Sequence, residues 1–236
     1  MTHRTFIQDP VGVLRDYAQS GAHVEPSVLE PELCDELIRV AGEFPGVKRG
    51  DFRTVLQPHR ESAAFMRALR HPRVTAIMKR ILDGEISGIQ TQFFYGKPGT
   101  PGFQPHQDNS FVNAPRGKFA SAWVALADVS QENGCLYIYP GSFNEALLQV
   151  QEVEAKETML QDINALKYRC VIPEKYQPVD LEMKKGSAAF FDGYTVHGSH
   201  KNESDRNRYV LLMTYIRRGA QFNTGRYAQR EEVAID

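Results

Sequence analysis

The feature that most constrains the fold is a series of short, strand-like runs that begins at Ile86. These runs are rich in Phe, Tyr, Val and Ile, and turn-forming stretches such as KPGTPG and SQENG separate them. Many short strands at this spacing are typical of a double sheet or jelly roll. We therefore expect a mainly β protein with flanking helices and a double-stranded β-helix core of the jelly-roll, cupin-like kind. The runs are ISGIQTQFFYG, FQPHQD, FASAWVALADV, CLYIYPG, GSAAFFDGYTV and RYVLLMTYI.

The length of the chain favours a single domain over residues 1–236. The jelly-roll core is expected over residues 86–219, interrupted by a more polar insertion near residues 143–179 that has room for a short helix. Residues 1–85 are expected to be mostly helical support for the sheet.

Two segments of this N-terminal part show helical spacing of apolar residues. The first, PSVLEPELCDELIRVAGEFPG, is expected to stop at Pro45 and Gly46. The second, ESAAFMRALRHPRVTAIMKRILDG, is expected to be interrupted near Pro72, because proline disfavours helix at the residue before it.

Composition excludes some partners. The chain has 28 basic and 29 acidic residues, so a dedicated nucleic-acid or membrane binder is not expected, and small-molecule partners are favoured. The start lacks a signal-type apolar segment, and no window approaches the roughly 18 apolar residues of a membrane span, which predicts a cytoplasmic protein. Oligomeric state stays open.

The cysteines are odd in number and are interpreted as reduced thiols in the core: Cys34, Cys135 and Cys170.

The stretch FQPHQDNSF, residues 103–111, contains a candidate metal-binding pair. In a strand, alternate side chains share a face, so His106 and Asp108 are expected to point together. An imidazole nitrogen and a carboxylate oxygen held in this way can bind one divalent metal ion. The pattern alone is not specific, because His23 and Glu25 form a rival pair in a region without a strand pattern.

A third ligand is expected from the later segment DGYTVHGSHKNESDRNRYVL. A jelly roll can bring His197 beside the earlier pair, and two histidines with one carboxylate form the facial triad of non-haem Fe(II) oxygenases. Such a triad leaves coordination positions open for oxygen chemistry. Asp192 is interpreted as a turn residue and kept only as a substitute ligand, and His200 is expected to be solvated in a loop.

The charge of such a centre calls for a buried cation. Fe(II) with two neutral imidazoles and one carboxylate carries a single positive charge, and dianionic 2-oxoglutarate reverses its sign. Arg208 begins the strand YVLLMTYI, which is expected to pair near the His197 strand, and its guanidinium suits a carboxylate. Arg206, on the same face by strand alternation, is the alternative anchor.

Together, the segments HQDNSF, AWVALADVSQENGCLYIYPGS and VHGSHKNESDRNRYVL resemble the phytanoyl-CoA dioxygenase (PhyH) family of Fe(II)/2-oxoglutarate-dependent oxygenases. The resemblance runs from about Gln90 to Gly219, with residues 143–179 unmatched. It implies Fe(II), the co-substrate 2-oxoglutarate and O2 as cofactors. It also implies the following roles: His106, Asp108 and His197 as iron ligands, Arg208 as the anchor of the distal carboxylate of 2-oxoglutarate with Ser199 assisting, Trp123 as a wall of the co-substrate pocket, and Tyr95 as a co-substrate contact.

The resemblance implies hydroxylation of a C–H bond in a small molecule, with release of succinate and CO2. The carboxylate of Asp108 favours hydroxylation over chlorination, because related halogenases lack this ligand. Gln92, Asn109 and Phe111 lie beside the metal motif and are expected to line the substrate pocket. The sequence does not select among acyl thioesters, amino-acid-like compounds, phosphonates and natural-product scaffolds.

Three alternatives remain open at the level of sequence. The protein is either an oxygenase, a non-catalytic jelly-roll sensor that binds a metal and a keto acid, or a cupin-like metal isomerase or hydrolase without a keto acid. A basic stretch over residues 48–60 either receives a phosphate or carboxylate group or is a solvated loop balanced by neighbouring acids. Its members are Lys48, Arg49, Arg53, His59 and Arg60.

Overall fold

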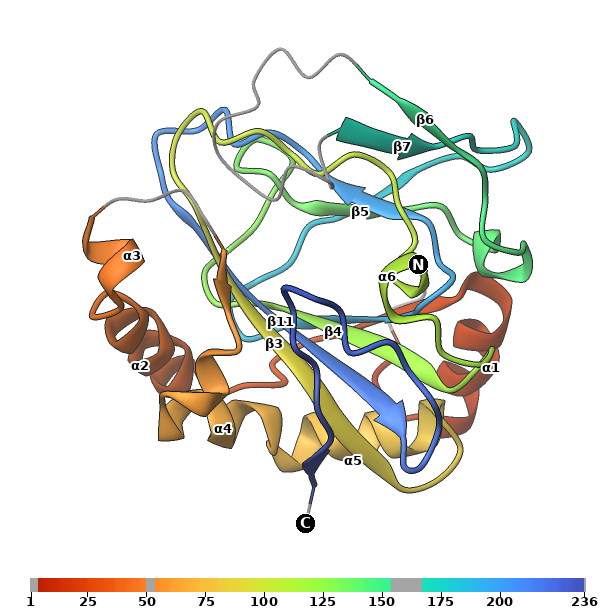
Figure 1. Cartoon of the computed structure of the whole chain (residues 1–236), viewed down its shortest axis with the longest axis horizontal. Coiled ribbons are helices and arrows are strands. Elements are labelled where there is room, and N and C mark those ends of the chain that lie inside the picture. The colour runs from red at the N-terminus through yellow and green to blue at the C-terminus, as the bar shows by residue number, and fades with distance from the viewer. Residues whose placement is uncertain (1–3, 50–53, 154–166, 236) are drawn as a thin grey trace.

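The computed structural model describes residues 4–49, 54–153 and 167–235. Its core consists of two antiparallel sheets that face each other, the arrangement of a double-stranded β-helix (Figure 1). The large, seven-stranded sheet runs in the order β1 (Ala22–Glu25), β9 (Ala188–Asp192), β4 (Phe119–Ala125), β11 (Arg208–Arg217), β3 (Ile86–Gly96) and β12 (Val233–Ala234), and β2 (Val55–Leu56) also pairs with β3. The small sheet runs β10 (His197–Ser199), β5 (Leu136–Ile138) and β8 (Val179–Leu181), and β6 (Val150–Glu152) pairs with β7 (Tyr168–Cys170).

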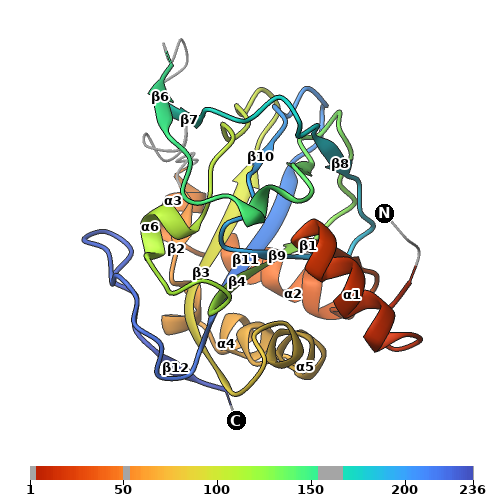
Figure 2. The ribbon, with the colours of Figure 1, turned by 90° about the vertical axis from the view of Figure 1, so that its right-hand side faces the viewer.

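Helices of the N-terminal part cover the outer face of the large sheet, while the small sheet and the short helix α6 (Asn109–Val112) lie on its other side (Figures 1 and 2). Four of these helices begin with a proline, whose fixed φ suits the first helical position. Within the described residues, no helix is long and apolar enough to cross a bilayer. The helices are α1 (Pro10–Ser20), α2 (Pro31–Ala41), α3 (Pro45–Lys48), α4 (Ala63–Leu69), α5 (Pro72–Ile81) and α6 (Asn109–Val112), with 3-10 turns η1 (Pro58–Arg60) and η2 (Ser142–Asn144).

Strand β4 shows how the sheet separates two layers. Its even-numbered residues, such as Ala122 and Val124, belong to the apolar cluster that contains the side chains of α2, α4 and α5. Its odd-numbered residues, Trp123 and Ala125, belong to a second cluster between the two sheets. Alternation therefore assigns each strand residue either to the helix-facing layer or to the interior of the barrel.

The predicted strand series is confirmed except for the run FQPHQD, and β3 has the bounds of the run ISGIQTQFFYG. The predicted helical interruption is confirmed too, because α4 ends at Leu69 and α5 begins at Pro72. The predicted end of the first helical segment is wrong. Helix α2 already ends at Ala41, and Pro45 begins α3 instead of stopping a helix, because proline is well suited to a helical N-terminus.

The expectation that residues 1–85 are mostly helical is incomplete. Strand β1, from this part of the chain, extends the large sheet by pairing with β9, and β2 pairs with β3. The rival pair His23 and Glu25 lies on β1, where no strand was expected. Four residues give too short a pattern to be distinguished from a loop without the partner strand.

The expectation of a strand at residues 103–108 is wrong. Only His106 forms a bridge, with His197, and Asp108 has helical backbone angles at the start of α6. Residues 143–179 contain β6 and β7, which form an antiparallel pair. The 3-10 turn η2 lies at the start of this range. Residues 154–166, the middle of this insertion, lie outside the described part of the chain.

Candidate metal centre

His106, Asp108 and His197 converge between the two sheets. The Nε2 atoms of His106 and His197 each lie 3.5 Å from Oδ1 of Asp108, and the ring centroids of the two histidines are 4.3 Å apart. One ligand atom from each residue lies within 4.8 Å of the others. Two imidazole nitrogens and one carboxylate oxygen on one side of a divalent ion form the facial donor set of non-haem iron sites.

Hydrogen bonds to the backbone orient both imidazoles. Nδ1 of His106 lies 2.7 Å from the carbonyl oxygen of Gln104, and Nδ1 of His197 lies 2.9 Å from that of Thr195. A carbonyl oxygen only accepts, so each Nδ1 must carry the proton. Each Nε2 of the neutral ring therefore presents a lone pair, as a metal ligand requires.

Ser121 orients the carboxylate of Asp108. Its hydroxyl donates a 2.7 Å hydrogen bond to Oδ2, so Oδ1 is the atom that faces the two histidines. Sequence reasoning missed this residue. The available signal was its inward position on β4, two residues before Trp123, but no motif marks a serine at that place.

The environment of Asp108 keeps it charged. Burial favours the neutral acid, but it is outweighed by the charge that His197 carries when both of its ring nitrogens are protonated and by the hydrogen bonds that both histidines then donate, so the pKa of Asp108 is held well below its usual range. The side chains of His106 and Asp108 are 18 and 13 % exposed, against 5 % for His197. The carboxylate of Asp108 is therefore ionised. The three side chains are most accessible to solvent on the side of His106 and α6.

Arg208 is a buried cation at the start of β11. Its residue is 2 % exposed, its Nη1 donates to the carbonyl oxygen of Gly134 at 2.5 Å, and its buried Nε has no hydrogen-bond partner. Within the described chain, no carboxylate pairs with it, and burial lowers its pKa to about 10. The unpaired edge of the guanidinium fits a carboxylate ligand, as 2-oxoglutarate provides.

The expected pairing of the Arg208 strand is wrong. Strand β11 pairs with β3 and β4 in the large sheet, whereas β10, which carries His197, belongs to the small sheet. Arg208 and His197 therefore face each other across the barrel instead of lying on neighbouring strands. The sequence pattern indicated that both segments were strands, but it did not indicate which sheet each one joins.

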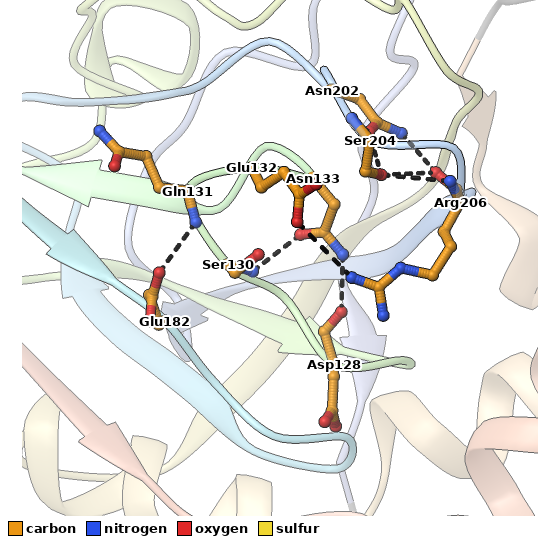
Figure 3. A network of polar contacts seen from close by, with 9 residues as sticks. All are labelled: Asp128, Ser130, Gln131, Glu132, Asn133, Glu182, Asn202, Ser204 and Arg206. Atoms are coloured by element: carbon orange, nitrogen blue, oxygen red, sulfur yellow. Dashed lines mark hydrogen bonds and ion pairs between the residues drawn. The ribbon is translucent and has the colours of Figure 1, made fainter.

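Arg206, the alternative anchor, is excluded by its position. It precedes β11, so strand alternation does not apply to it, and its side chain is 63 % exposed with Glu132 at 3.9 Å. Figure 3 shows it in a polar network that joins the turn at residues 128–133 to the loop at residues 202–206. This network fixes the loop from which Arg208 enters the barrel.

Ser199 and Trp123 lie on strands of opposite sheets, β10 and β4. Ser199 is two residues beyond His197 on β10, on the same face, and its hydroxyl accepts a 3.0 Å hydrogen bond from the Phe103 N–H. Trp123 pairs with Leu212 across β4 and β11, and both side chains face the barrel interior. These positions are consistent with the predicted co-substrate pocket.

Tyr95 does not face this pocket, so its predicted contact with the co-substrate is wrong. It pairs with Tyr209 across β3 and β11, stacks near Phe93 with ring centroids 6.1 Å apart, and belongs to the helix-facing cluster. The neighbouring Gly96, paired with Arg208, is the inward position. A one-residue offset reverses the face of a strand residue.

The predicted substrate residues have different surroundings. Gln92 is half-buried on β3 and faces inward, because it pairs with Leu212. Phe111, on α6, is 39 % exposed, and its ring centroid lies 6.3 Å from that of His106. Asn109 is contradicted as a substrate contact, because it is 1 % exposed and its amide makes two hydrogen bonds, of 3.0 and 2.9 Å, to the backbone of Ala114.

Other candidate ligands have structural roles. His23 and Glu25 form a buried 2.9 Å pair on the helix-facing side of β1. Asp192 accepts a 2.8 Å hydrogen bond from the Tyr194 N–H in the turn after β9, as expected for a turn residue. His200 is half-buried and bonds to Asp180 at 2.6 Å, so the expectation that it is solvated is wrong. With Cys135, this pair forms a second group of possible ligand atoms.

The basic stretch at residues 48–60 does not act as one site. Lys48 pairs with Glu43 at 2.6 Å and Arg60 with Glu231 at 2.9 Å, while His59 is buried against Thr91. Arg53 lies outside the described residues. The three cysteines are unpaired and buried, as predicted.

This chain is similar to proteins of one family. The family model described as "Phytanoyl-CoA dioxygenase (PhyH)" matches residues 17–210. Phytanoyl-CoA dioxygenase domain-containing protein 1 of Danio rerio is 32% identical over 154 residues, which are 64% of this chain and 52% of that protein. Ectoine dioxygenase of Nocardia farcinica is 29% identical over 184 residues, or 69% and 58% of the two chains. The chain thus spans about half the length of these relatives.

Solved structures share the fold at low sequence identity. The alpha-ketoglutarate-dependent carbocyclase SnoK from nogalamycin biosynthesis has a TM-score of 0.75 and 21% identity, covering 96% of this chain and 92% of that chain. The epimerase SnoN, in complex with Fe3+, alpha ketoglutarate and nogalamycin RO, has a TM-score of 0.72 and 19% identity, covering 95% and 94%. The family match includes all three candidate metal ligands and Arg208. The chain belongs to the phytanoyl-CoA dioxygenase (PhyH) family.

Proposed function

We propose that this protein is an Fe(II)- and 2-oxoglutarate-dependent dioxygenase that hydroxylates a C–H bond of a small molecule and releases succinate and CO2. The PhyH family uses Fe(II), 2-oxoglutarate and O2, and His106, Asp108 and His197 provide a matching donor set. One observation carries the proposal. A facial donor set and the unpaired guanidinium edge of Arg208 lie in the same barrel, as a metal-bound dianion with a distal carboxylate requires.

Some residues of the proposed pocket bind the co-substrate, and others exclude water. When bound, Fe(II) and 2-oxoglutarate would activate O2, which is the oxidant of the reaction. Arg208 holds the distal carboxylate, and the O–H of Ser199 is available to donate, because its oxygen already accepts from Phe103. Trp123 and Leu212 line the space between the two ends with apolar surface, which keeps water from the reacting centre.

The substrate approaches from the side of α6. His106 and Asp108 are the more exposed ligands, and the ring of Phe111 stands next to His106. Gln92 adds a polar group from the inward face of β3. Asp108 occupies the coordination place that chloride would need, so the proposed outcome is transfer of oxygen and not of halide.

Succinate formation separates this proposal from its alternatives. Purified protein with Fe(II) and 2-oxoglutarate is expected to release succinate only when oxygen is present, and a substrate of matching shape should gain one oxygen by mass. A sensor protein would bind both ligands without oxygen-dependent succinate release. A metal isomerase or hydrolase without a keto acid would keep its activity when Arg208 is replaced by alanine.

A further inference from the structure

Arg230 lies in the C-terminal segment, residues 218–235, which runs beside α6 (Figures 1 and 2). Its Nη1 donates hydrogen bonds of 3.2 Å to the carbonyl oxygens of Phe111 and Asn223. The Asn223 N–H in turn donates to the Val112 carbonyl at 2.6 Å. These contacts hold the guanidinium against the helix that follows the metal ligand Asp108.

The guanidinium of Arg230 has an unsatisfied edge. Its Nε is buried and has no hydrogen-bond partner, and within the described residues no carboxylate forms an ion pair with Arg230. The adjacent acid, Glu231, instead pairs with Arg60. Buried donors are almost always satisfied in folded proteins, and a bound anion is one partner that would satisfy this one. The parallel N–H groups at an Nε edge match the two oxygens of a carboxylate or phosphate.

Arg208 and Arg230 share this pattern. In each residue, Nη1 is bonded to a backbone carbonyl oxygen, and a buried Nε lacks a partner. Arg208 begins β11, where the proposed function places the co-substrate. Arg230 lies on the open side, because it bonds to the backbone of Phe111, whose ring lies edge-on to that of His106 with centroids 6.3 Å apart.

Arg230 interacts electrostatically with the candidate metal ligand Asp108. Burial lowers the pKa of Arg230, and the charge of Asp108 acts in the opposite direction. The turn at Gly225 also accommodates the guanidinium. Gly225 has a φ of +70°, and a Cβ atom there would lie 2.7 Å from Nη1 of Arg230. The segment is therefore shaped around this side chain.

We propose that Arg230 binds a carboxylate or phosphate group of the primary substrate and so places an anionic small molecule over the open face of the metal centre. This inference rests on the proposed function, because that function is what makes the bound molecule a substrate. Arg230 follows the last residue matched by the family model, residue 210, so the comparison does not assign it a role.

Binding, measured without turnover, tests the proposal. The protein is loaded with Zn(II) in place of Fe(II) and with saturating 2-oxoglutarate, which occupies Arg208. The probes are matched pairs: hexanoate with hexanamide, 4-phenylbutyrate with 4-phenylbutyramide, and hexyl phosphate with hexanol. Their dissociation constants are measured by saturation-transfer NMR. Wild-type protein is expected to bind the anion of at least one pair about 10- to 100-fold more tightly than its neutral counterpart.

Two variants test whether the preference for anions depends on Arg230. Arg230→Gln, which keeps a donor for the carbonyl contacts, is expected to reduce the preference to less than about twofold. Arg226→Gln is the matched control, because Arg226 is exposed in the same segment and lies over the ring of Tyr227. It should keep the wild-type preference. A structural role for Arg230 would lower the melting temperature in Arg230→Gln without changing the preference.

The proposal is overturned if wild-type protein binds no anion better than its neutral partner, or if Arg230→Gln keeps the preference. Failure of the proposed function gives a different result. In that case succinate formation is absent in wild-type protein, while the anion preference and its dependence on Arg230 are unaffected.

Discussion

His106 and His197 exchange both of their backbone hydrogen bonds, with N···O distances of 2.9 and 3.0 Å, although they come from distant parts of the sequence. This bridge joins the segment before α6 to β10 and brings the two imidazoles together. Asp108 then enters from the start of α6. The candidate metal centre is therefore formed at the point where the barrel closes, and it depends on long-range pairing.

Ser121→Ala tests the hydrogen bond that orients Asp108. Without the 2.7 Å bond to Oδ2, the carboxylate is free to rotate, and the affinity for Fe(II) is expected to fall about 10- to 100-fold. Anaerobic titration with Fe(II) measures the change. Ser110→Ala is the control, because this exposed serine bonds only to the Gln107 carbonyl. Equal affinities in the two variants would contradict this role of Ser121.

Arg208→Lys tests the co-substrate anchor. Lysine keeps the positive charge but loses the two-pronged geometry, so the dissociation constant for 2-oxoglutarate is expected to rise about 10- to 100-fold. Trp123, the only tryptophan in the chain, lines the proposed pocket and gives a fluorescence signal for an anaerobic titration.

Arg206→Gln is the matched control for this titration. Its side chain is exposed and paired with Glu132, outside the barrel (Figure 3). The variant should bind 2-oxoglutarate as wild-type protein does. The anchor would have to be reassigned if Arg206→Gln weakened binding and Arg208→Lys did not.

His59 predicts how stability depends on pH. Burial and the charge of Arg60 lower the pKa of His59 from 6.5 to about 4, so the unfolded chain takes up a proton that the folded protein does not. The free energy of unfolding therefore has its full value above pH 6.5 and decreases as the pH falls toward 4. The decrease due to His59 amounts to roughly 3 kcal/mol over that range. Urea unfolding at pH 7 and pH 5 should show a smaller loss for His59→Gln. An equal loss in both proteins would contradict this assignment.

Much of the fold was predictable because its signals are local. The strand runs and the break before Pro72 follow from alternation, turn residues and proline geometry. His106, Asp108 and His197 were predictable as a candidate group because their residue types suit one metal, and the structure brings them together. The predicted geometry of the first pair is partly wrong, since Asp108 lies at a helix start and not on a strand.

The remaining features depend on tertiary pairing. Whether Tyr95 faces the barrel or the helices depends on the register of β3 with β11, and a one-residue offset inverts the answer. Ser121 meets Asp108 only because β4 passes beneath α6 (Figure 1). The position of Arg230 depends on how the C-terminal segment packs against α6. No periodicity in the sequence encodes these contacts.

The central claim is that His106, Asp108 and His197 bind one Fe(II) ion together with 2-oxoglutarate. Its most direct test is the visible absorption of the anaerobic protein as Fe(II) and then 2-oxoglutarate are added, compared between the wild type and Asp108→Ala. Wild-type protein should develop a weak charge-transfer band only when both ligands are present, and Asp108→Ala should not develop it at the same concentrations. A band of equal strength in Asp108→Ala, or no band in wild-type protein, would contradict the claim.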